Sequence, residues 1–136
     1  MPMSYVVCED GKLVLERWTG NVSHQEVVEH VRRQLQDVSI APGAAILANC
    51  TEASFDTPAD RVFEISAPHG QTNNKTRISK YALLMNDETW ERGQILSKQA
   101  EKYGITIIVF CSLDAACTWL GIEERKAAAL IESIDT

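Results

Sequence analysis

Apolar residues in this 136-residue chain fall into short continuous runs that alternate with segments of helical periodicity. The clearest example begins at Ile105, where a β-branched run continues to Cys111 and passes through Ser112 into a helical pattern that ends at Gly121. The run is too short to cross a membrane, and its enrichment in Ile and Val is typical of a buried strand. The pattern predicts a strand followed directly by a helix, the basic unit of a helix-covered, largely parallel sheet.

The N-terminal part of the chain follows the same alternation. Short apolar runs flank Asp10-Gly11, a dipeptide favoured in two-residue hairpin turns, so we expect an antiparallel pair over about residues 4–9 and 12–18. The segment Trp18-Thr19-Gly20-Asn21 is then expected to turn into a helix, which begins with the capping-box pair Ser23 and Glu26. The apolar residues of this helix lie at helical spacing: Val27, Val28, Val31, Leu35 and Val38.

The same signals predict the remaining elements. Strands are expected at 44–50, 78–85 and 105–111, and helices from about 57, at 87–103, at 112–120 and from about 123. The order β-β-α-β-α-β-α-β-α-α predicts an α/β fold with right-handed crossovers. We expect a single domain with a mixed, mostly parallel sheet of four to five strands and helices packed on it. Its core spans residues 5–121, followed by a C-terminal helix at about 123–134. The polar segment 68–77 is the longest expected loop.

Several side chains have specific expected roles in this arrangement. Thr57 is placed at the N-cap of the second helix with Pro58 at the first helical position, and Asp87 is placed at the cap of the third. Gly93 belongs to a face of small residues that lets its helix lie close to the sheet, although glycine costs ~1 kcal/mol in helix propensity. His30 is placed on an outer helix face.

Composition narrows the classes of function. An apolar fraction of 45% and a charged fraction of 24% are ordinary for a soluble globular protein. The net charge of −6 argues against nucleic-acid binding, which needs a concentrated basic surface; the densest basic group is Lys75, Arg77 and Lys80. No apolar run approaches the ~18–20 residues of a membrane span, so no membrane insertion is expected. The first residues also lack the regions of a signal peptide.

Neither a metal nor another cofactor is expected. Cys8, Cys50, Cys111 and Cys117 contain no Cys-x-x-Cys pair, and the histidines do not pair at metal-ligand spacing. Cysteines in apolar segments usually act as small hydrophobic residues, so Cys111 is expected to be a buried thiol; the alternative is a thiolate at a helix N-terminus. The simplest compartment for such cysteines is a reducing cytoplasm.

The chain resembles the SpoIIAA-like branch of the STAS superfamily, also described as STAS/SEC14-like. The matching landmarks are Gly20 before the first helix, the strand Ala45-Ile46-Leu47-Ala48-Asn49, and Val109-Phe110-Cys111-Ser112 followed by Ala115-Ala116-x-x-Trp119-Leu120. The likeness covers roughly residues 5–121. It implies a four- or five-stranded sheet with packed helices, no enzymatic activity, and binding of a protein partner or a small ligand.

The resemblance also implies a candidate phosphoacceptor. STAS antagonists carry a phosphorylatable Ser after an Asp at the start of the second helix, and Asp56-Thr57 falls at the matching place. Two positions depart from that pattern: Asn49 stands where an acidic residue is common, and Pro58-Ala59-Asp60 replaces a small, glycine-containing turn. Thr57 is therefore the residue for which phosphorylation is to be tested.

Polar residues gather where the predicted parallel strands end. Because carboxyl ends of parallel strands share one edge of a sheet, they are candidates for lining a ligand crevice there. The candidates are Asn49, Thr51, Glu52, Asn86, Asp87 and Ser112, with Trp90 as a covering residue. The alternative is that Asp87 and Ser112 only cap helices, that the other polar residues solvate turns, and that Trp90 belongs to the core.

The sequence favours a non-catalytic binding or regulatory module that acts through protein contacts or a small ligand at this carboxyl edge. One alternative is a carrier of apolar, lipid-like ligands in the manner of SEC14 domains, which requires an internal apolar cavity. Another is a small enzyme that uses Cys111 or the carboxylates of Glu52 and Asp87. Apolar surfaces formed by Ile65 beside Val62 and by Leu130 with Ile134 also predict a two-fold homodimer, since one small domain need not bury them all.

Overall fold

The computed structural model describes residues 3–70 and 78–135, and within them the centre of the molecule is a five-stranded sheet in the order β1-β2-β3-β4-β5. β1 is antiparallel to β2, and all other neighbouring strands are parallel. The strands are β1 (Met3–Cys8), β2 (Leu13–Val22), β3 (Ala44–Phe55), β4 (Ile78–Leu84) and β5 (Thr106–Phe110). The predicted α/β class, mixed sheet and element order are therefore confirmed.

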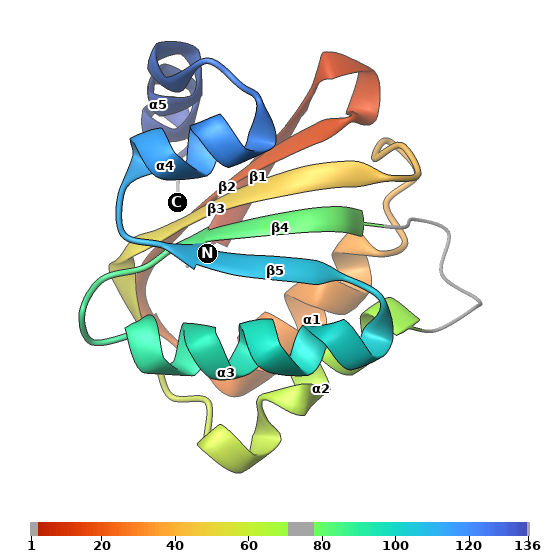
Figure 1. Cartoon of the computed structure of the whole chain (residues 1–136), viewed down its shortest axis with the longest axis vertical. Coiled ribbons are helices and arrows are strands. Elements are labelled where there is room, and N and C mark those ends of the chain that lie inside the picture. Colours follow the sequence, from red (N-terminus) through yellow and green to blue (C-terminus); the bar gives the residue numbers. More distant parts are fainter. Residues whose placement is uncertain (1–2, 71–77, 136) are drawn as a thin grey trace.

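Helices cover both faces of the sheet (Figure 1). On one face lie α1 (His24–Gln34), α2 (Phe63–Ser66) and α3 (Trp90–Ala100), and on the other α4 (Leu113–Leu120) and α5 (Glu124–Ser133). Each face has its own apolar core, because alternate residues of a strand point to opposite sides. Val14, Ile46 and Leu83 face the first group of helices, whereas Leu15 and Leu47 face α4 and α5.

The opening hairpin is confirmed, but its turn is wider than predicted. Cys8 pairs with Leu13, so four residues, not two, connect the strands. Glu9, Asp10 and Gly11 all have positive φ. A Cβ atom on Gly11 would lie 2.6 Å from the backbone oxygen of Ser39, and the Gly11 carbonyl accepts a 2.8 Å hydrogen bond from the Ala41 amide. Close packing against the loop before β3 therefore selects this turn.

β2 and β3 both extend past their predicted ends. The segment Trp18–Asn21, expected to form a turn, instead belongs to β2, and Thr19–Val22 pairs with Glu52–Phe55 after an irregularity between Arg17 and Thr19. The ladder satisfies the backbone of these polar residues, and the Ser54 hydroxyl donates a 2.6 Å hydrogen bond to Asn21. Thr51 and Glu52 consequently lie within β3 rather than beyond its end.

The first helix begins as predicted and ends early. The capping box of Ser23 and Glu26 is present, but α1 stops at Gln34, so Val38 lies outside the helix and is 81% exposed. The prediction for His30 is wrong: its side chain points inward and is buried. His30 follows the buried Val27 by three residues, a spacing that places both side chains on the inward face of the helix.

Two predicted caps are also wrong. Pro58 is extended and α2 begins only at Phe63, so Thr57 caps no helix; its buried hydroxyl group lies 3.2 Å from Nδ1 of His24. α3 begins after a turn at 87–89, and Asp87 is exposed. Asn86 instead accepts a hydrogen bond from the Thr89 amide and donates its own amide to the Thr89 hydroxyl.

Other local predictions hold. A Cβ atom on Gly93 would lie 3.0 Å from Cγ2 of Val109, which confirms the close approach of α3 to the sheet. The Ser112 side chain caps α4. Of the predicted polar loop 68–77, residues 68–70 belong to the 3-10 helix Ala67–Gly70, whereas 71–77, including Lys75 and Arg77, lie outside the described residues. In residues 3–70 and 78–135, no helix is both long and apolar enough to span a bilayer.

Candidate functional site

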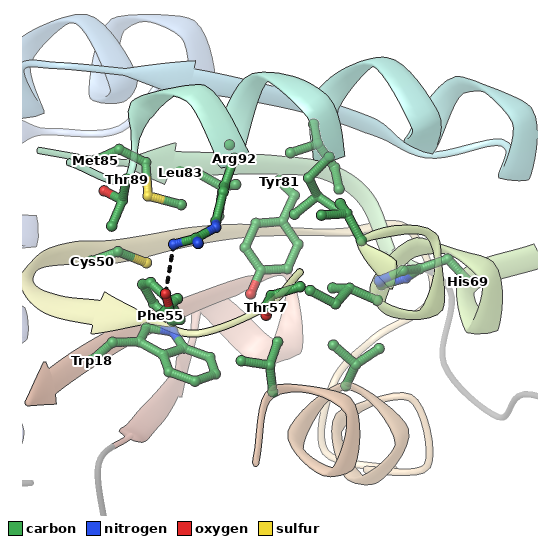
Figure 2. A pocket seen from close by; sticks show the side chains of 17 residues that line it. Trp18, Cys50, Phe55, Thr57, His69, Tyr81, Leu83, Met85, Thr89 and Arg92 are labelled. Atoms are coloured by element: carbon green, nitrogen blue, oxygen red, sulfur yellow. Dashed lines mark hydrogen bonds between the residues drawn. The ribbon is translucent and has the colours of Figure 1, made fainter. Parts of the chain in front are cut away.

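An apolar cavity of about 70 Å³ lies between the sheet and the helices α1, α2 and α3 (Figure 2). Sheet residues form its floor, and apolar residues from the three helices form its walls and roof. The main lining residues are Trp18, Cys50, Tyr81 and Leu83 from the strands, Val27 and Val31 from α1, Ile65 from α2, and Gly93 and Leu96 from α3. The close approach of Gly93 to the sheet therefore shapes one side of this cavity.

Arg92 is the one exposed residue among the described lining residues of the cavity, and we infer from this that the mouth of the cavity lies beside it. Phe55, Ile65 and His69 are half-buried. Figure 2 shows the Arg92 side chain extending from α3 to the end of β3, where Nη1 donates a 2.7 Å hydrogen bond to the carbonyl oxygen of Phe55. Phe55 ends β3 and the lining residue Met85 follows β4, so the mouth lies toward the carboxyl edge of the parallel strands.

A buried carboxylate lies beside the cavity floor. Glu16 on β2 has no exposed surface, and donors surround both of its oxygens. Oε1 accepts hydrogen bonds from Trp18 Nε1 at 3.0 Å and from the Tyr81 hydroxyl at 2.6 Å; Oε2 accepts one from Gln34 Nε2 at 2.6 Å and lies 3.3 Å from His30 Nε2. Trp18 and Tyr81 also line the cavity, so this network holds two residues of the cavity floor in place.

The network keeps Glu16 ionised. Burial by itself raises the pKa of Glu16, but the nearby His30 and the surrounding hydrogen bonds hold that pKa below its ordinary value. The pKa values of Tyr81 and Cys50 are both raised well above their ordinary values, by burial and by the Glu16 charge. At neutral pH the cavity therefore contains a neutral phenol and a neutral thiol.

His69 is the polar lining residue with an unsatisfied atom. Its Nδ1 is buried and has no hydrogen-bond partner among the described residues. Burial lowers the pKa of His69 from 6.5 to about 4, and the Glu16 charge opposes this shift. The imidazole is therefore neutral at pH 7. The hydroxyl groups of two further lining residues have hydrogen-bond partners: Thr57 lies next to His24, and Thr89 donates to Asn86.

The candidate residues predicted at the carboxyl edge do not line this cavity, and the structure brings only some of them together. Asn49 Oδ1 accepts hydrogen bonds from the Thr51 amide and hydroxyl, and Asn86 Nδ2 donates to the Thr51 carbonyl. Asn49 and Glu52 border a separate depression beside α4 and α5.

The remaining candidates lie apart. Asp87 and Ser112 are exposed, and Ser112 caps α4. Trp90 is half-buried against the core and is not part of the cavity lining. Ligand binding by this set stays a prediction.

Thr57 and Cys111 differ from expectation in their surroundings. Thr57 is only 3% exposed, so a kinase would require local opening of its segment; its phosphorylation stays a prediction. Cys111, expected to be buried, is exposed after the end of β5. Within residues 3–70 and 78–135, no group of three His, Cys, Asp or Glu side chains is arranged to hold a metal ion.

No pattern in the sequence marks the lining residues of the cavity as one group. Glu16 carried one usable signal, since it alternates with Val14 and Trp18 and so shares their inward face. Recognising it as a network centre requires knowing that α1 and β4 bring His30, Gln34 and Tyr81 to it. Arg92 carried no signal that distinguished it from other exposed cations.

Comparison with solved structures identifies a similar fold. The chain is similar to an uncharacterised protein of the DUF3478 family with a SpoIIAA-like fold from Shewanella loihica PV-4, with a TM-score of 0.54 and 14% identity over 87% of this chain and 93% of that chain. Unphosphorylated SpoIIAA, an anti-sigma factor antagonist, matches with a TM-score of 0.43 and 16% identity over 88% and 97%. No family model matches this sequence, and neither does any curated protein. The resemblance to SpoIIAA-like domains is confirmed as a resemblance of fold.

Proposed function

We propose that this SpoIIAA-like domain is a non-catalytic binding module whose ligand places an apolar group in the cavity between the sheet and α1, α2 and α3. The observation that supports the proposal is the cavity itself, which has apolar walls and reaches solvent beside Arg92. Protein interiors are normally packed with few voids larger than a water molecule, and apolar cavities of this kind bind small apolar molecules.

The size of the cavity restricts the ligand. At about 70 Å³ it has roughly half the volume of an engineered cavity of about 150 Å³ that binds benzene. A short alkyl group or one aliphatic side chain suits this space, whereas a whole phospholipid does not. Of the SEC14-like alternative, the volume of the cavity therefore supports the binding of small apolar ligands and not the carriage of whole lipids.

The chemistry of the cavity supports a non-catalytic role. Cys50 and Tyr81 have raised pKa values, so neither is an activated nucleophile at neutral pH. The Glu16 carboxylate is saturated by its surrounding donors and is not positioned to take a proton from a ligand. These groups hold the shape of the site rather than perform a reaction.

Small apolar probes test the proposal. Propane, a short alkane that suits a cavity of about 70 Å³, should shift the amide resonances of residues that line the cavity, including Val31 and Leu96, in a saturable manner. Val31→Phe fills the cavity and should abolish this response, and Val38→Phe, at an exposed position outside the cavity, should not. Circular dichroism establishes whether each variant folds, and a smaller filler, Val27→Leu, should weaken binding if Val31→Phe does not fold. Wild-type protein that fails to respond to propane would overturn the proposal.

One observation favours a second candidate function, the hydrolysis of small esters. Oγ1 of Thr57 lines the cavity and lies 3.2 Å from His24 Nδ1, and His24 Nε2 lies 3.5 Å from Glu64 Oε2. A hydroxyl group can act as a nucleophile when an imidazole takes its proton and a carboxylate orients that imidazole. Hydrolysis of p-nitrophenyl butyrate should then be lost in Thr57→Val and kept in the exposed control Thr51→Val. A rate equal to the uncatalysed one in wild-type protein excludes this candidate.

Binding to a protein partner, including a homodimer, stays a prediction, as does a cytoplasmic location. Most of the apolar residues cited for a dimer pack within the domain: Val62 and Ile134 are buried, and Leu130 is half-buried. The large hydrophobic side chains exposed in the described part of the chain are Val38 and Phe63. Sedimentation at micromolar concentration tests self-association, and the 15.1 kDa mass of a monomer would contradict it.

A further inference from the structure

We propose that the ligand of the cavity is a small carboxylic acid, with its carboxylate on Arg92 at the mouth and its short apolar tail inside. This inference rests on the proposed function and adds the chemical class of the ligand. It combines two independent features, an apolar interior and a cation placed where that interior meets solvent.

Arg92 has donors available for a carboxylate. A guanidinium group carries five N–H donors, and the hydrogen bond that Arg92 makes among the described residues uses one of them, from Nη1 to the Phe55 carbonyl. None of the ion pairs found among the described residues involves Arg92. The planar fork of arginine matches a carboxylate in bidentate geometry, and such charge-assisted hydrogen bonds are stronger than neutral ones.

The cation that precedes the lining residue Val62 is already paired with a carboxylate. Arg61 Nε lies 2.6 Å from Glu64 Oε1, and its Nη2 donates to the other oxygen of the same carboxylate. Among the described lining residues, Arg92 is therefore the cation that remains available to an anionic ligand. The protein carries a net charge of −6, so a local cation at an apolar opening is not explained by a generally basic surface.

The Glu16 charge sets the orientation of the ligand. Its carboxylate accepts hydrogen bonds from Trp18 and Tyr81, which line the cavity, so a negative charge lies beside the interior and raises the pKa values of Tyr81 and Cys50. An anionic head group inside would be both desolvated and repelled, so only an uncharged tail can enter. An amine head group inside is disfavoured as well, because the Glu16 oxygens are already saturated by donors.

The experiment compares acids with alcohols of equal chain length. Butanoate, hexanoate and octanoate, and the matching alcohols, are titrated into wild-type protein, Arg92→Gln and Arg125→Gln at neutral pH, with calorimetry and amide shifts as readouts. Arg125 is an exposed cation on α5, on the opposite face of the sheet, and provides the matched control. The wild type should bind the best acid about tenfold more tightly than its alcohol, the ratio expected for one charge-assisted interaction.

In Arg92→Gln the affinity for the acid should fall to that for the alcohol, while binding of the alcohol stays unchanged. Arg125→Gln should behave as the wild type. Equal binding of acid and alcohol by the wild type would overturn the assignment of the acid and leave the apolar site intact. Absence of binding by every acid and alcohol would overturn this inference and the proposed function together. An equal loss of acid affinity in both variants would mean that the net charge of the protein, and not a contact with Arg92, favours the acid. That result would also overturn the inference.

Discussion

The Tyr81 hydroxyl group on β4 donates a 2.6 Å hydrogen bond to Glu16 on β2, although β3 lies between these strands in the sheet. The bond passes over Ala48, the β3 residue that pairs with Glu16 and has no exposed surface. A larger side chain at Ala48 would occupy this space. The cavity floor and the buried carboxylate are thus parts of one arrangement, in which Tyr81 belongs to both.

Removing the Tyr81 hydroxyl should destabilise the protein without changing the ring that lines the cavity. Tyr81→Phe should lower the free energy of unfolding by about 2 kcal/mol, the value for a hydrogen bond to a charged group. Tyr103→Phe is the matched control, since Tyr103 is half-buried and no hydrogen bond from its hydroxyl to a described residue is found. Urea denaturation measures both variants. Equal losses would mean that the Tyr81–Glu16 hydrogen bond contributes no net stability.

His69 should make stability depend on pH in a defined interval. Its pKa is lowered from 6.5 to about 4 in the folded protein, so between these values the unfolded chain binds a proton that the folded chain does not. The contribution to stability is complete above pH 6.5 and is lost as pH falls toward 4, by up to about 3 kcal/mol.

The His69→Gln variant tests the assignment, because glutamine does not titrate. Denaturant midpoints measured from pH 7 to pH 4 should show a shallower decline for this variant than for wild-type protein. Glu16, whose pKa is lowered, contributes stability that is lost only below its ordinary pKa of 4.5, so most of the two effects fall in different intervals. An unchanged slope between pH 6.5 and 4 would assign the titration to other groups.

Gly93→Ala should destabilise the protein although alanine is the better helix former. Helix propensity favours alanine by about 1 kcal/mol, but the new Cβ atom would lie 3.0 Å from Val109 Cγ2 and 3.4 Å from Met85 Cγ. Overpacking of this kind typically costs about 1–3 kcal/mol, so we expect a net loss of about 1 kcal/mol. Gly93→Ala combined with Val109→Ala should lose less stability than the two single losses added together. A more stable Gly93→Ala variant would show that α3 can move away from the sheet.

Arg17 should hold the end of α5 on the sheet. Its Nη1 donates hydrogen bonds to the carbonyl oxygens of Glu132 and Ile134, at 3.1 and 3.0 Å. These carbonyls lie in the last turn of α5 and just beyond it, where no further helical amide satisfies them. Arg17→Met keeps the aliphatic stem and removes the donors. Amide exchange at 131–134 should become about tenfold faster, which corresponds to one lost hydrogen bond of this strength. Arg125→Met should leave exchange unchanged, and the same rates in both variants would exclude this role.

Local signals in the sequence were sufficient for the order of the elements, the capping box of Ser23 and the cap at Ser112. They failed where tertiary contacts outweigh local preference. Thr19–Val22 has the composition of a turn, yet pairing with β3 satisfies its backbone and makes it a strand. Asp87 precedes a helix and is a favourable cap, but the exchange of hydrogen bonds between Asn86 and Thr89 fixes a different start.

The candidate site was less accessible to sequence analysis than the fold. The donors to Glu16 stand 2, 14, 18 and 65 residues away from it, so only the assembled sheet and α1 bring them together. The expectation of a site toward the carboxyl edge followed from strand order, and the mouth of the cavity lies toward that edge. The lining residues of the cavity could not be identified from the sequence, because only the packing of α3 on the sheet places Arg92 beside the cavity.

The far end of β3 has a free side that could recruit another strand. Beyond Asn49 and Leu84 the pairing of β3 with β4 stops, whereas β3 continues for six residues to Phe55. Three alternate carbonyls on this stretch are taken by side chains: Asn86 Nδ2 lies 3.1 Å from Thr51 O and 3.5 Å from Ala53 O, and Arg92 reaches Phe55 O. Side-chain donors thus occupy the carbonyl oxygens to which the amides of an added strand would bind. Unpaired strand edges are templates for aggregation. The hydrogen bonds of Asn86 and Arg92 to this edge therefore oppose the pairing of β3 with a strand of another molecule.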